Sequence, residues 1–262
     1  MPRLVALLLT AVLVVAAAPA SAERPPADPA AVTPVPAGTD LDYQLGGPSE
    51  PDPRVGIVVR DRLTEPAEGL YNVCYVNAFQ TQPGERRFWR QRRGLVLRAG
   101  GRPVTDPGWP DEWLLDISTS RKRQRLARIV GRWVARCAAD GFDAVEYDNL
   151  DSYTRSRGRL TPRHATRYAR LLTRAAHRHG LAAGQKNRAQ WDGRRAGFDF
   201  AVAEQCGQWD ECGDLVDHYG DQVLVVEYRH RGFDRACRQV GATLPVVLRD
   251  RALRPDGPRE WC

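Results

Sequence analysis

Short apolar runs recur along this chain, and long amphipathic stretches separate several of them. Such runs, rich in Val, Ile, Leu and aromatic residues, are typical of buried strands. Eight of them predict strands, at Asp42–Leu45, Val55–Arg60, Tyr71–Phe79, Trp113–Ile117, Ala144–Tyr147, Leu181–Lys186, Phe198–Ala203 and Val223–Tyr228. A ninth run, Pro245–Leu248, is either an added strand or part of the last closure.

Two stretches between these runs have the pattern of helices. From about Arg121 to Ala139, apolar residues repeat every three or four positions and Arg fills the other face. This helix is expected to start at Ser118 or Ser120. A second helix is predicted from Pro162 to His179, because a Thr stands at its N-cap, a Pro at its first position and a Gly just beyond its end.

Strands that alternate with helices predict right-handed crossovers and a parallel sheet. Eight strands in one chain of this length favour the α/β class and a (β/α)8 barrel of the TIM type, as a single domain over residues 40–262. The early crossovers are short, so a distorted barrel or an open doubly wound sheet is the alternative. We find no internal repeat and no second domain.

The first 22 residues have the pattern of a signal peptide. Arg3 supplies a positive charge, an apolar run extends from Leu4 to Ala18, and small residues at 20–22 suit a signal peptidase. The run is short for a membrane span, so we predict a secreted, extracellular protein, cleaved near Ala22, without stable membrane association. Residues 23–39, rich in Pro and Ala, are expected to form an extended linker.

All six cysteines follow the predicted cleavage site. An even number in an exported chain favours disulfides over a zinc site, for which the sequence offers no CxxC or HxxxH spacing. Fifteen connectivities are possible for three bridges. The six-residue separation of Cys206 and Cys212 makes this pair the best single expectation, and the other pairings stay open.

The chain has 39 Lys and Arg against 32 Asp and Glu, a formal net charge of +7. Its 42% apolar content excludes a disordered chain, and a mean hydropathy of −0.49 excludes a multispan membrane protein. Only Lys122 and Lys186 are lysines, and the arginines are spread along the sequence instead of forming one short cluster. We therefore predict no nucleic-acid partner.

Polar side chains follow the predicted strands, at the edge where a barrel carries its active site. They are unusually acidic: Asp61, Asn77, Gln80, Asp116, Glu146, Asp148, Asn149, Asp151, Lys186, Asn187, Glu204, Gln205, Glu227 and Tyr228. Carboxylates without clustered His or Cys argue against zinc and thiol chemistry. A pair of carboxyl groups held apart is what acetal cleavage requires, because one protonates the leaving oxygen while the other attacks or stabilises the sugar cation.

Structural roles compete with each of these assignments. Glu146 alternates with apolar neighbours and could face outward, Asp148 could cap the next turn, and Glu227 could pair with Lys186 or an Arg. Glu204 directly follows an apolar run, which favours a carboxyl group facing the mouth. The histidines show no ligand spacing, and the chain has no GxSxG elbow, P-loop or GxGxxG motif. Asp148 and Glu204 are thus the leading catalytic candidates.

Several segments together resemble glycoside hydrolase family 114, the endo-α-1,4-polygalactosaminidases and their relatives. They are Tyr43–Leu45, Cys74–Tyr75, Trp113–Ile117, Gly141–Asp151, Gly184–Asn187, Glu204–Cys206 and Glu227–Tyr228, in the family's order and approximate spacing. The resemblance implies a (β/α)8 barrel that cleaves an α-1,4-linked galactosamine polymer internally. It also implies Asp148 and Glu204 as the catalytic pair, and we assign them as nucleophile and general acid/base of a retaining mechanism. Retention requires carboxyl groups about 5 to 5.5 Å apart, whereas about 6.5 to 9.5 Å would indicate inversion.

The resemblance further implies a disulfide between Cys206 and Cys212. The remaining strand-end residues would bind substrate: Asp61, Tyr75, Asp116, Glu146, Asn149, Asp151, Lys186, Asn187, Glu227 and Tyr228. The chain departs from the family at Tyr147, where a Pro usually precedes the catalytic Asp, and at Val59–Asp61, which is less acidic than usual.

We therefore expect a monomeric glycoside hydrolase that acts on a polysaccharide or oligosaccharide and needs no cofactor or metal. Two alternatives come from other classes. An inactive barrel could keep the sugar cleft as a lectin, or the Arg-rich surface could bind an anionic polymer. A glycosidase for a different glycan is the nearest variant of the first hypothesis.

Overall fold

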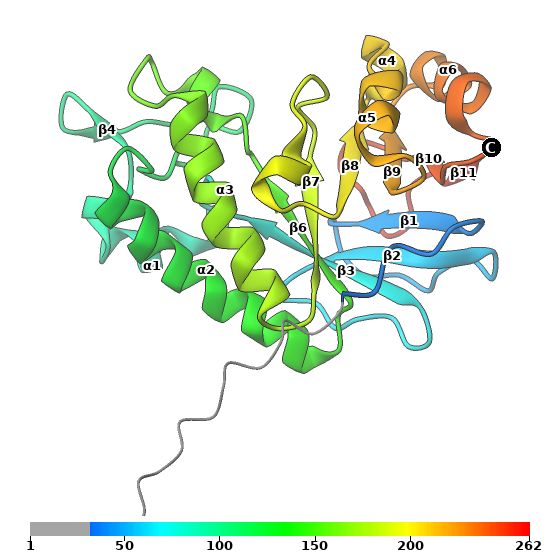
Figure 1. The fold of residues 1–262 in the computed structure, drawn as a ribbon, viewed down its shortest axis with the longest axis horizontal. Helices are drawn as coiled ribbons and strands as arrows, with labels where there is room; N and C mark the ends of the chain where they lie inside the picture. Colours follow the sequence, from blue (N-terminus) through cyan, green and yellow to red (C-terminus); the bar gives the residue numbers. More distant parts are fainter. Residues whose placement is uncertain (1–31) are drawn as a thin grey trace, which may run out of the picture.

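The computed structural model describes residues 32–262, so the predicted signal peptide lies outside the described residues. Eight parallel strands form one sheet, with a ninth, antiparallel strand at its end (Figure 1). In sheet order they are β1 (Asp40–Gln44), β2 (Val55–Asp61), β3 (Tyr71–Asn77), β6 (Ala144–Asp148), β7 (Ala182–Lys186), β8 (Phe200–Glu204), β9 (Val223–Glu227), β10 (Val246–Leu248) and the antiparallel β11 (Glu260–Trp261). The predicted (β/α)8 barrel is confirmed.

One predicted strand is wrong. Trp113–Ile117 does not enter the barrel, because β3 pairs directly with β6, with Val73 opposite Ala144. Its residues form isolated antiparallel bridges, such as Leu114 with Gln80, inside the long crossover from β3 to β6. The ninth candidate, Pro245–Leu248, supplies β10 and restores the count of eight parallel strands. Sequence periodicity identifies an extended segment, but only the pairing shows which sheet it joins.

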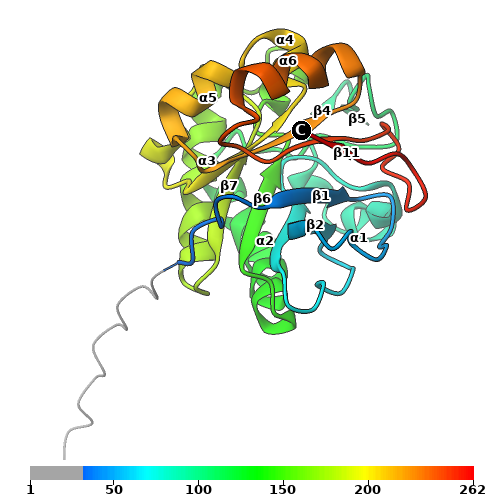
Figure 2. The same cartoon turned by 90° about the vertical axis from the view of Figure 1, so that its right-hand side faces the viewer.

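Helices cover part of the barrel (Figures 1 and 2). They are α1 (Arg86–Arg90), α2 (Ser120–Asp140), α3 (Pro162–His177), α4 (Cys206–Trp209), α5 (Cys212–Tyr219) and α6 (His230–Val240). Short 3-10 helices lie at η1 (Pro83–Glu85), η2 (Arg93–Leu95), η3 (Ser152–Arg155) and η4 (Gly193–Ala196), and a two-stranded sheet at β4 (Arg98–Ala99) and β5 (Arg102–Pro103). No helix connects β1 to β2 or β2 to β3, so the barrel is distorted on that side.

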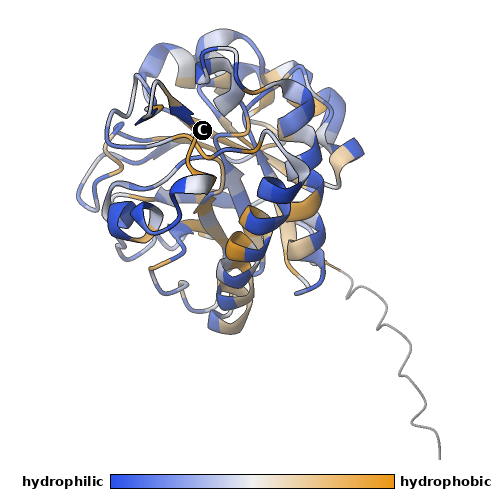
Figure 3. Ribbon diagram, turned by 90° about the vertical axis from the view of Figure 1, so that its left-hand side faces the viewer, coloured by the Kyte–Doolittle hydropathy of each residue, from blue (hydrophilic) through white to orange (hydrophobic). Residues whose placement is uncertain are grey.

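The two predicted helices form with the expected starts. α2 begins at Ser120, and the Thr119 side chain caps it by accepting a hydrogen bond from the Lys122 backbone N–H. Thr161 caps α3 in the same way, but α3 ends at His177, two residues before the predicted end. Figure 3 shows the side of the molecule that lies on the left in Figure 1. Hydrophilic and hydrophobic segments alternate along its helices, as expected for helices that bury one face.

Apolar side chains form two main layers. One layer fills the barrel interior, with Tyr43, Ile57 and Phe200 fully buried, and a larger one lies between the strands and the helices. Gly184 in β7 is required for the inner layer, because a Cβ there would lie 2.5 Å from the Phe200 ring. The barrel interior is therefore a packed core and not a channel.

Buried side chains join the first strand to the last parallel strand. Arg249, just after β10, donates from Nη1 to Asp42 Oδ1 in β1 at 2.6 Å and also to the Tyr43 carbonyl oxygen. Arg259 donates to the other Asp42 oxygen at 2.9 Å, and the Trp261 indole donates to the Leu41 carbonyl oxygen at 2.8 Å. Asp42 and Arg249 are both fully buried, so this ion pair closes the barrel inside the protein.

The folded part reaches back into the predicted linker. The Tyr71 hydroxyl donates to the Thr33 carbonyl oxygen at 2.8 Å, and the Val35 backbone N–H donates to Gln222 at 2.9 Å. Val35 is buried against the barrel. Residues 33–35 therefore pack on the domain, ahead of the predicted domain start at residue 40.

Three disulfides use all six cysteines, and the pair predicted from its short separation, Cys206–Cys212, is one of them. Cys74–Cys137 ties β3 to α2, and Cys237–Cys262 ties α6 to the C-terminal residue. No cysteine is left to bind zinc. None of the helices within residues 32–262 is long and apolar enough to cross a membrane.

We expect Arg249→Ala to lower the free energy of unfolding by about 3 kcal/mol, because the buried Asp42 carboxylate then keeps only Arg259 as a cationic partner and the Tyr43 carbonyl oxygen loses its donor. Arg54→Ala is a matched control, since Arg54 contacts Asp40 at the same 2.6 Å but its side chain is 48% exposed. The control should lose at most about 1 kcal/mol. Urea denaturation measures both values, and equal losses would contradict the closing role of Arg249.

Candidate active site

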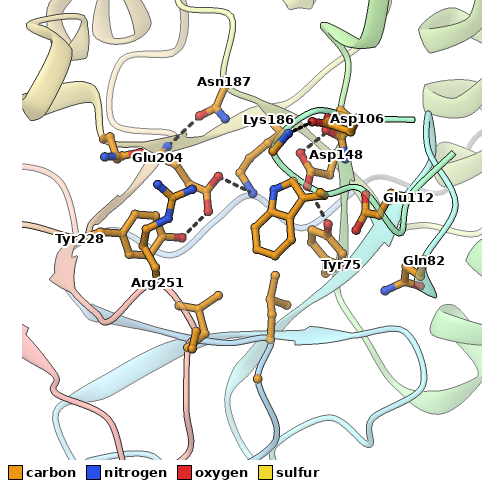
Figure 4. A pocket seen from close by; sticks show the side chains of 18 of the residues that line it. Tyr75, Gln82, Asp106, Glu112, Asp148, Lys186, Asn187, Glu204, Tyr228 and Arg251 are labelled. Carbon is orange, nitrogen blue, oxygen red and sulfur yellow. Dashed lines mark hydrogen bonds and ion pairs between the residues drawn. The ribbon is translucent and has the colours of Figure 1, made fainter. Parts of the chain in front are cut away.

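A cavity of about 660 Å³ opens at the carboxyl ends of the strands, where a barrel is expected to carry its active site (Figure 4). Residues from β2, β3, β6, β7 and β8 and from the adjoining loops line it. Nine of the twelve predicted catalytic or substrate-binding residues are among them: Asp61, Tyr75, Asp148, Asn149, Asp151, Lys186, Asn187, Glu204 and Tyr228.

Asp148 ends β6 and is held from two sides. The Tyr75 hydroxyl donates to its Oδ2 at 2.6 Å, and the Asn149 backbone N–H donates to its Oδ1 at 2.6 Å. Burial and the Asp148 charge raise the pKa of Tyr75 well above its usual value, so this tyrosine stays a neutral donor. Asn149 has a positive φ of 64° and donates from its side chain to Asn77 at 3.1 Å, which sharply turns the chain after the strand.

Glu204 ends β8 and lies across the Lys186 side chain from Asp148 (Figure 4). The Tyr228 hydroxyl donates to Glu204 Oε1, and the Lys186 ammonium lies 3.5 Å from Oε2. The backbone N–H of Glu204 donates to the Asn187 side chain at 2.8 Å. The Glu204 side chain is 26% exposed, so it is accessible to a molecule in the cavity while both of its oxygens have a partner.

Lys186 forms the floor of the cavity together with buried groups beneath it. Its ammonium contacts Glu146 at 2.6 Å and donates to the Tyr43 hydroxyl at 2.6 Å, and that hydroxyl donates to Glu146 at 2.9 Å. Burial disfavours the charged amine, but the carboxylates of Asp148, Glu146 and Glu204 outweigh it and raise the pKa of Lys186. Burial raises the pKa of Glu146, against the effect of the Lys186 charge.

Glu146 therefore points into the barrel below the cavity, and the alternative that it faces outward is wrong. Two further predicted residues also lie away from the cavity. Asp116 contacts Lys122 at 2.5 Å near the start of α2, because its segment is not a barrel strand. Glu227 is buried on the helix side of β9, where it accepts from the Gly207 N–H at 2.7 Å and not from Lys186. Burial raises the pKa of Glu227 to about 7.

The two departures from the family pattern leave the cavity intact. Tyr147 points to the helix side, where its hydroxyl donates to the Leu172 carbonyl oxygen at 2.9 Å. Arg60 turns away from the mouth and donates to Gln44 at 2.9 Å and to loop carbonyl oxygens. Asp61, the next residue, lines the cavity and accepts from Gln82 at 2.7 Å.

Sequence reasoning missed the lining residues that come from loops. Asp106, Trp109 and Glu112 belong to the long β3 to α2 crossover, Arg155 to η3, and Arg251 to the segment after β10. They do not follow a barrel strand, so a search of strand ends does not find them. The sequence did offer one signal for these loop residues. The segment Thr105–Trp113 places a Trp among Gly, Pro and acidic residues.

The cavity lining is acidic. It contains six carboxylates, Asp61, Asp106, Glu112, Asp148, Asp151 and Glu204, against three cations, Arg155, Lys186 and Arg251. Arg155 is occupied, because it contacts Asp106 at 2.6 Å and Asp151 at 2.8 Å. Glu112 has no cationic partner among the described residues and accepts only from Asn77 and Gln80. Burial, with the charges of Asp148 and Asp106 adding, raises its pKa to about 7.

Paired carboxylates at the mouth of a parallel barrel are an arrangement that glycoside hydrolysis uses. The chain belongs to glycoside hydrolase family 114, because the model of that family matches residues 21–262. The sequence matches no curated protein.

Solved structures show the same fold. Ega3 of Aspergillus fumigatus, solved in complex with galactosamine, is 23% identical, with a TM-score of 0.68 over 87% of this chain and 96% of Ega3. The glycoside hydrolase domain of PelA from Pseudomonas aeruginosa is 14% identical, with a TM-score of 0.60 over 85% of this chain and 98% of that domain. At these identities the likeness establishes the fold alone.

We expect Lys186→Met to destabilise the protein by about 3 to 5 kcal/mol, because it leaves Glu146 buried without its cation. The loss should shrink as the pH falls through the raised pKa of Glu146, since the protonated group carries no buried charge. Adding Glu146→Gln should recover most of the stability. Urea denaturation of the two single variants and the double variant measures the coupling, and additive losses would contradict it.

Proposed function

We propose that this protein is a secreted, retaining, endo-acting glycosidase that cleaves α-1,4-linked galactosamine-type exopolysaccharide. The observation that carries the proposal is the position of Asp148 and Glu204 on either side of Lys186 in an acidic cavity (Figure 4). The family resemblance assigns the catalytic pair to the same two positions. The three disulfides support an oxidising, extracellular location.

In the first step Glu204 protonates the glycosidic oxygen while Asp148 attacks the anomeric carbon, so the leaving chain departs with the proton and a covalent glycosyl-enzyme forms. In the second step Glu204 takes a proton from water as the water attacks the anomeric carbon and releases Asp148. Hydrogen bonds from Tyr75 and Tyr228 hold the two carboxyl groups in place. Lys186, 3.5 Å from Glu204, stabilises the carboxylate that remains after proton transfer.

The charge of the cavity supports an amino sugar as substrate. A deacetylated galactosamine polymer is cationic, and carboxylates without a cationic partner favour it. Glu112 is such a group, and the Asp61 carboxylate accepts from neutral Gln82 and from the Leu63 backbone N–H. The indole of Trp109, 54% exposed at the mouth, offers a flat apolar surface against which a sugar ring can pack. The galactosamine complex of Ega3 agrees with this substrate class.

We expect Asp148→Asn and Glu204→Gln each to lower kcat on de-N-acetylated polygalactosamine by roughly 10³-fold or more, because each removes a group that acts in the transition state. Asp217→Asn, an exposed carboxylate on α5, is the control and should keep wild-type turnover. Released reducing ends measure the rate. Near-normal turnover in either test variant would overturn the catalytic pair, and substrate binding by the wild type without turnover would favour the lectin alternative.

The same reaction followed by NMR distinguishes the two stereochemical courses. A double displacement through Asp148 should first release the α-anomer of the new reducing end, before mutarotation. First release of the β-anomer would indicate inversion and a water molecule activated by one carboxylate, which would overturn the role of Asp148 as nucleophile.

Glu112→Gln should weaken binding of a cationic galactosamine oligomer by about fivefold at pH 7.5, the size of one partly exposed ion pair. The pKa of Glu112 is raised to about 7, so its carboxylate is charged above this pH and neutral below it. The advantage of the wild type in KM should therefore disappear as the pH falls to 5.5. Glu68→Gln, on an exposed loop, is the control, and a pH-independent KM ratio would contradict the assignment.

A further inference from the structure

The helices α2 and α3 carry an extreme excess of positive charge. α2 has seven cationic side chains, Arg121, Lys122, Arg123, Arg125, Arg128, Arg132 and Arg136, and one acid, Asp140. α3 adds four arginines, Arg163, Arg167, Arg170 and Arg174, and contains no acid. The arginines are spread out along the sequence, but the packing of α2 against α3 brings several of them together on one side of the molecule.

Two neighbouring hollows lie on this side. The first, of about 460 Å³, is lined by Arg128 and Arg132 from α2 and by Arg174 and Arg178 from the end of α3. The second, of about 240 Å³, shares Arg128 and Arg132 and adds Arg92 and Arg125. We call these six residues the arginine face. The two helices that carry most of it, α2 and α3, are labelled in Figure 1.

The arginine face lacks counter-charges. Within residues 32–262, none of its six guanidinium groups forms a salt bridge, whereas eleven other arginines of the chain do. Arg92 is half-buried over the Phe88 ring, 3.6 Å from its centroid, and the other five are exposed. Exposed like charges without partners repel one another, and a bound polyanion would relieve that repulsion.

We propose that the arginine face binds a single-chain polyanion of phosphodiester-linked polyol units, such as poly(glycerol phosphate). Guanidinium groups bind phosphate oxygens with paired, charge-assisted hydrogen bonds. Arg128 and Arg132, and likewise Arg174 and Arg178, are four residues apart, which places successive cations about 6 Å apart along each helix axis. Two such rows facing one hollow suit a flexible chain with a charge on every unit.

The lining of the hollows favours a polymer without bases. Single-stranded nucleic acids are held by aromatic side chains on which their bases stack, and neither hollow has an aromatic residue in its lining. Between the arginines lie small or aliphatic residues, Ala127, Gly131 and Leu171, which leave room for a thin chain. The proposed ligand is therefore recognised by its regular charge and not by stacking.

This binding site is separate from the proposed active site. No residue of the arginine face lines the catalytic cavity, and the two surfaces carry opposite charge. The inference goes beyond the proposed function, because an anionic polymer is not the substrate class of an acidic cavity. Binding at the arginine face would anchor the enzyme to an anionic matrix while the cavity stays open to its substrate.

The test measures binding of purified poly(glycerol phosphate) to the full protein by fluorescence anisotropy over a series of salt concentrations. The test variant carries Arg128→Gln, Arg132→Gln and Arg174→Gln. The control carries Arg195→Gln, Arg231→Gln and Arg238→Gln, which are exposed arginines outside the arginine face. Each variant therefore loses three positive charges. Polygalacturonate, duplex DNA and vesicles with anionic phospholipid are compared as ligands.

We expect the test variant to bind poly(glycerol phosphate) at least about tenfold more weakly at 50 mM salt and to show a shallower salt dependence, while the control loses less than about threefold. Equal losses in the two variants would overturn the site, since they would reflect net charge alone. Tighter binding of polygalacturonate, DNA or vesicles would overturn the ligand class. Both variants should keep the wild-type melting temperature and turnover, so failure of the proposed glycosidase activity would be seen separately.

Discussion

The buried ion pair between Asp42 and Arg249 is the contact on which the rest of the molecule depends. A parallel sheet of eight strands has two edges, and this pair joins the strand at one edge, β1, to the end of β10. Arg259 occupies the second oxygen of Asp42, so the carboxylate is fully compensated inside the protein. With the sheet closed in this way, the carboxyl ends of β2, β3, β6, β7 and β8 face one mouth. The cavity that holds Asp148 and Glu204 exists because those ends converge.

A second buried ion pair, Lys186 with Glu146, links the barrel core to the cavity above it. Lys186 and Glu146 form an ion pair below the cavity, and the Lys186 ammonium also reaches Glu204 at the surface of the site. Burial of a charged amine is unfavourable in itself, and the carboxylates of Asp148, Glu146 and Glu204 outweigh that cost and raise the pKa of Lys186. The chain uses arginine at nearly all its other cationic positions, and a compact ammonium is the group that contacts Glu146, Tyr43 and Glu204 from this one point.

Charge is separated between two surfaces of the protein. The net charge of +7 hides an acidic cavity and a face of unpaired arginines on α2 and α3. The proposed glycosidase activity depends on the acidic cavity, and the proposed binding of a polyanion depends on the arginine face. Net charge alone therefore describes neither surface, since each is set by which side chains the fold brings together.

The sequence by itself determined the class of fold, most of the strands, the starts of α2 and α3 and the two carboxylates that end β6 and β8. These features are local, since apolar periodicity, capping residues and the first polar residue after a strand act over a few positions. Only the tertiary structure decided that Trp113–Ile117 leaves the barrel, that Asp116 and Glu227 lie away from the mouth, and that Trp109 and Glu112 reach it from a long crossover. It also brought Arg125, Arg128 and Arg132 of α2 together with Arg174 of α3 on one face. Those outcomes depend on contacts between residues far apart in the chain, and no short pattern in the sequence encodes such a contact.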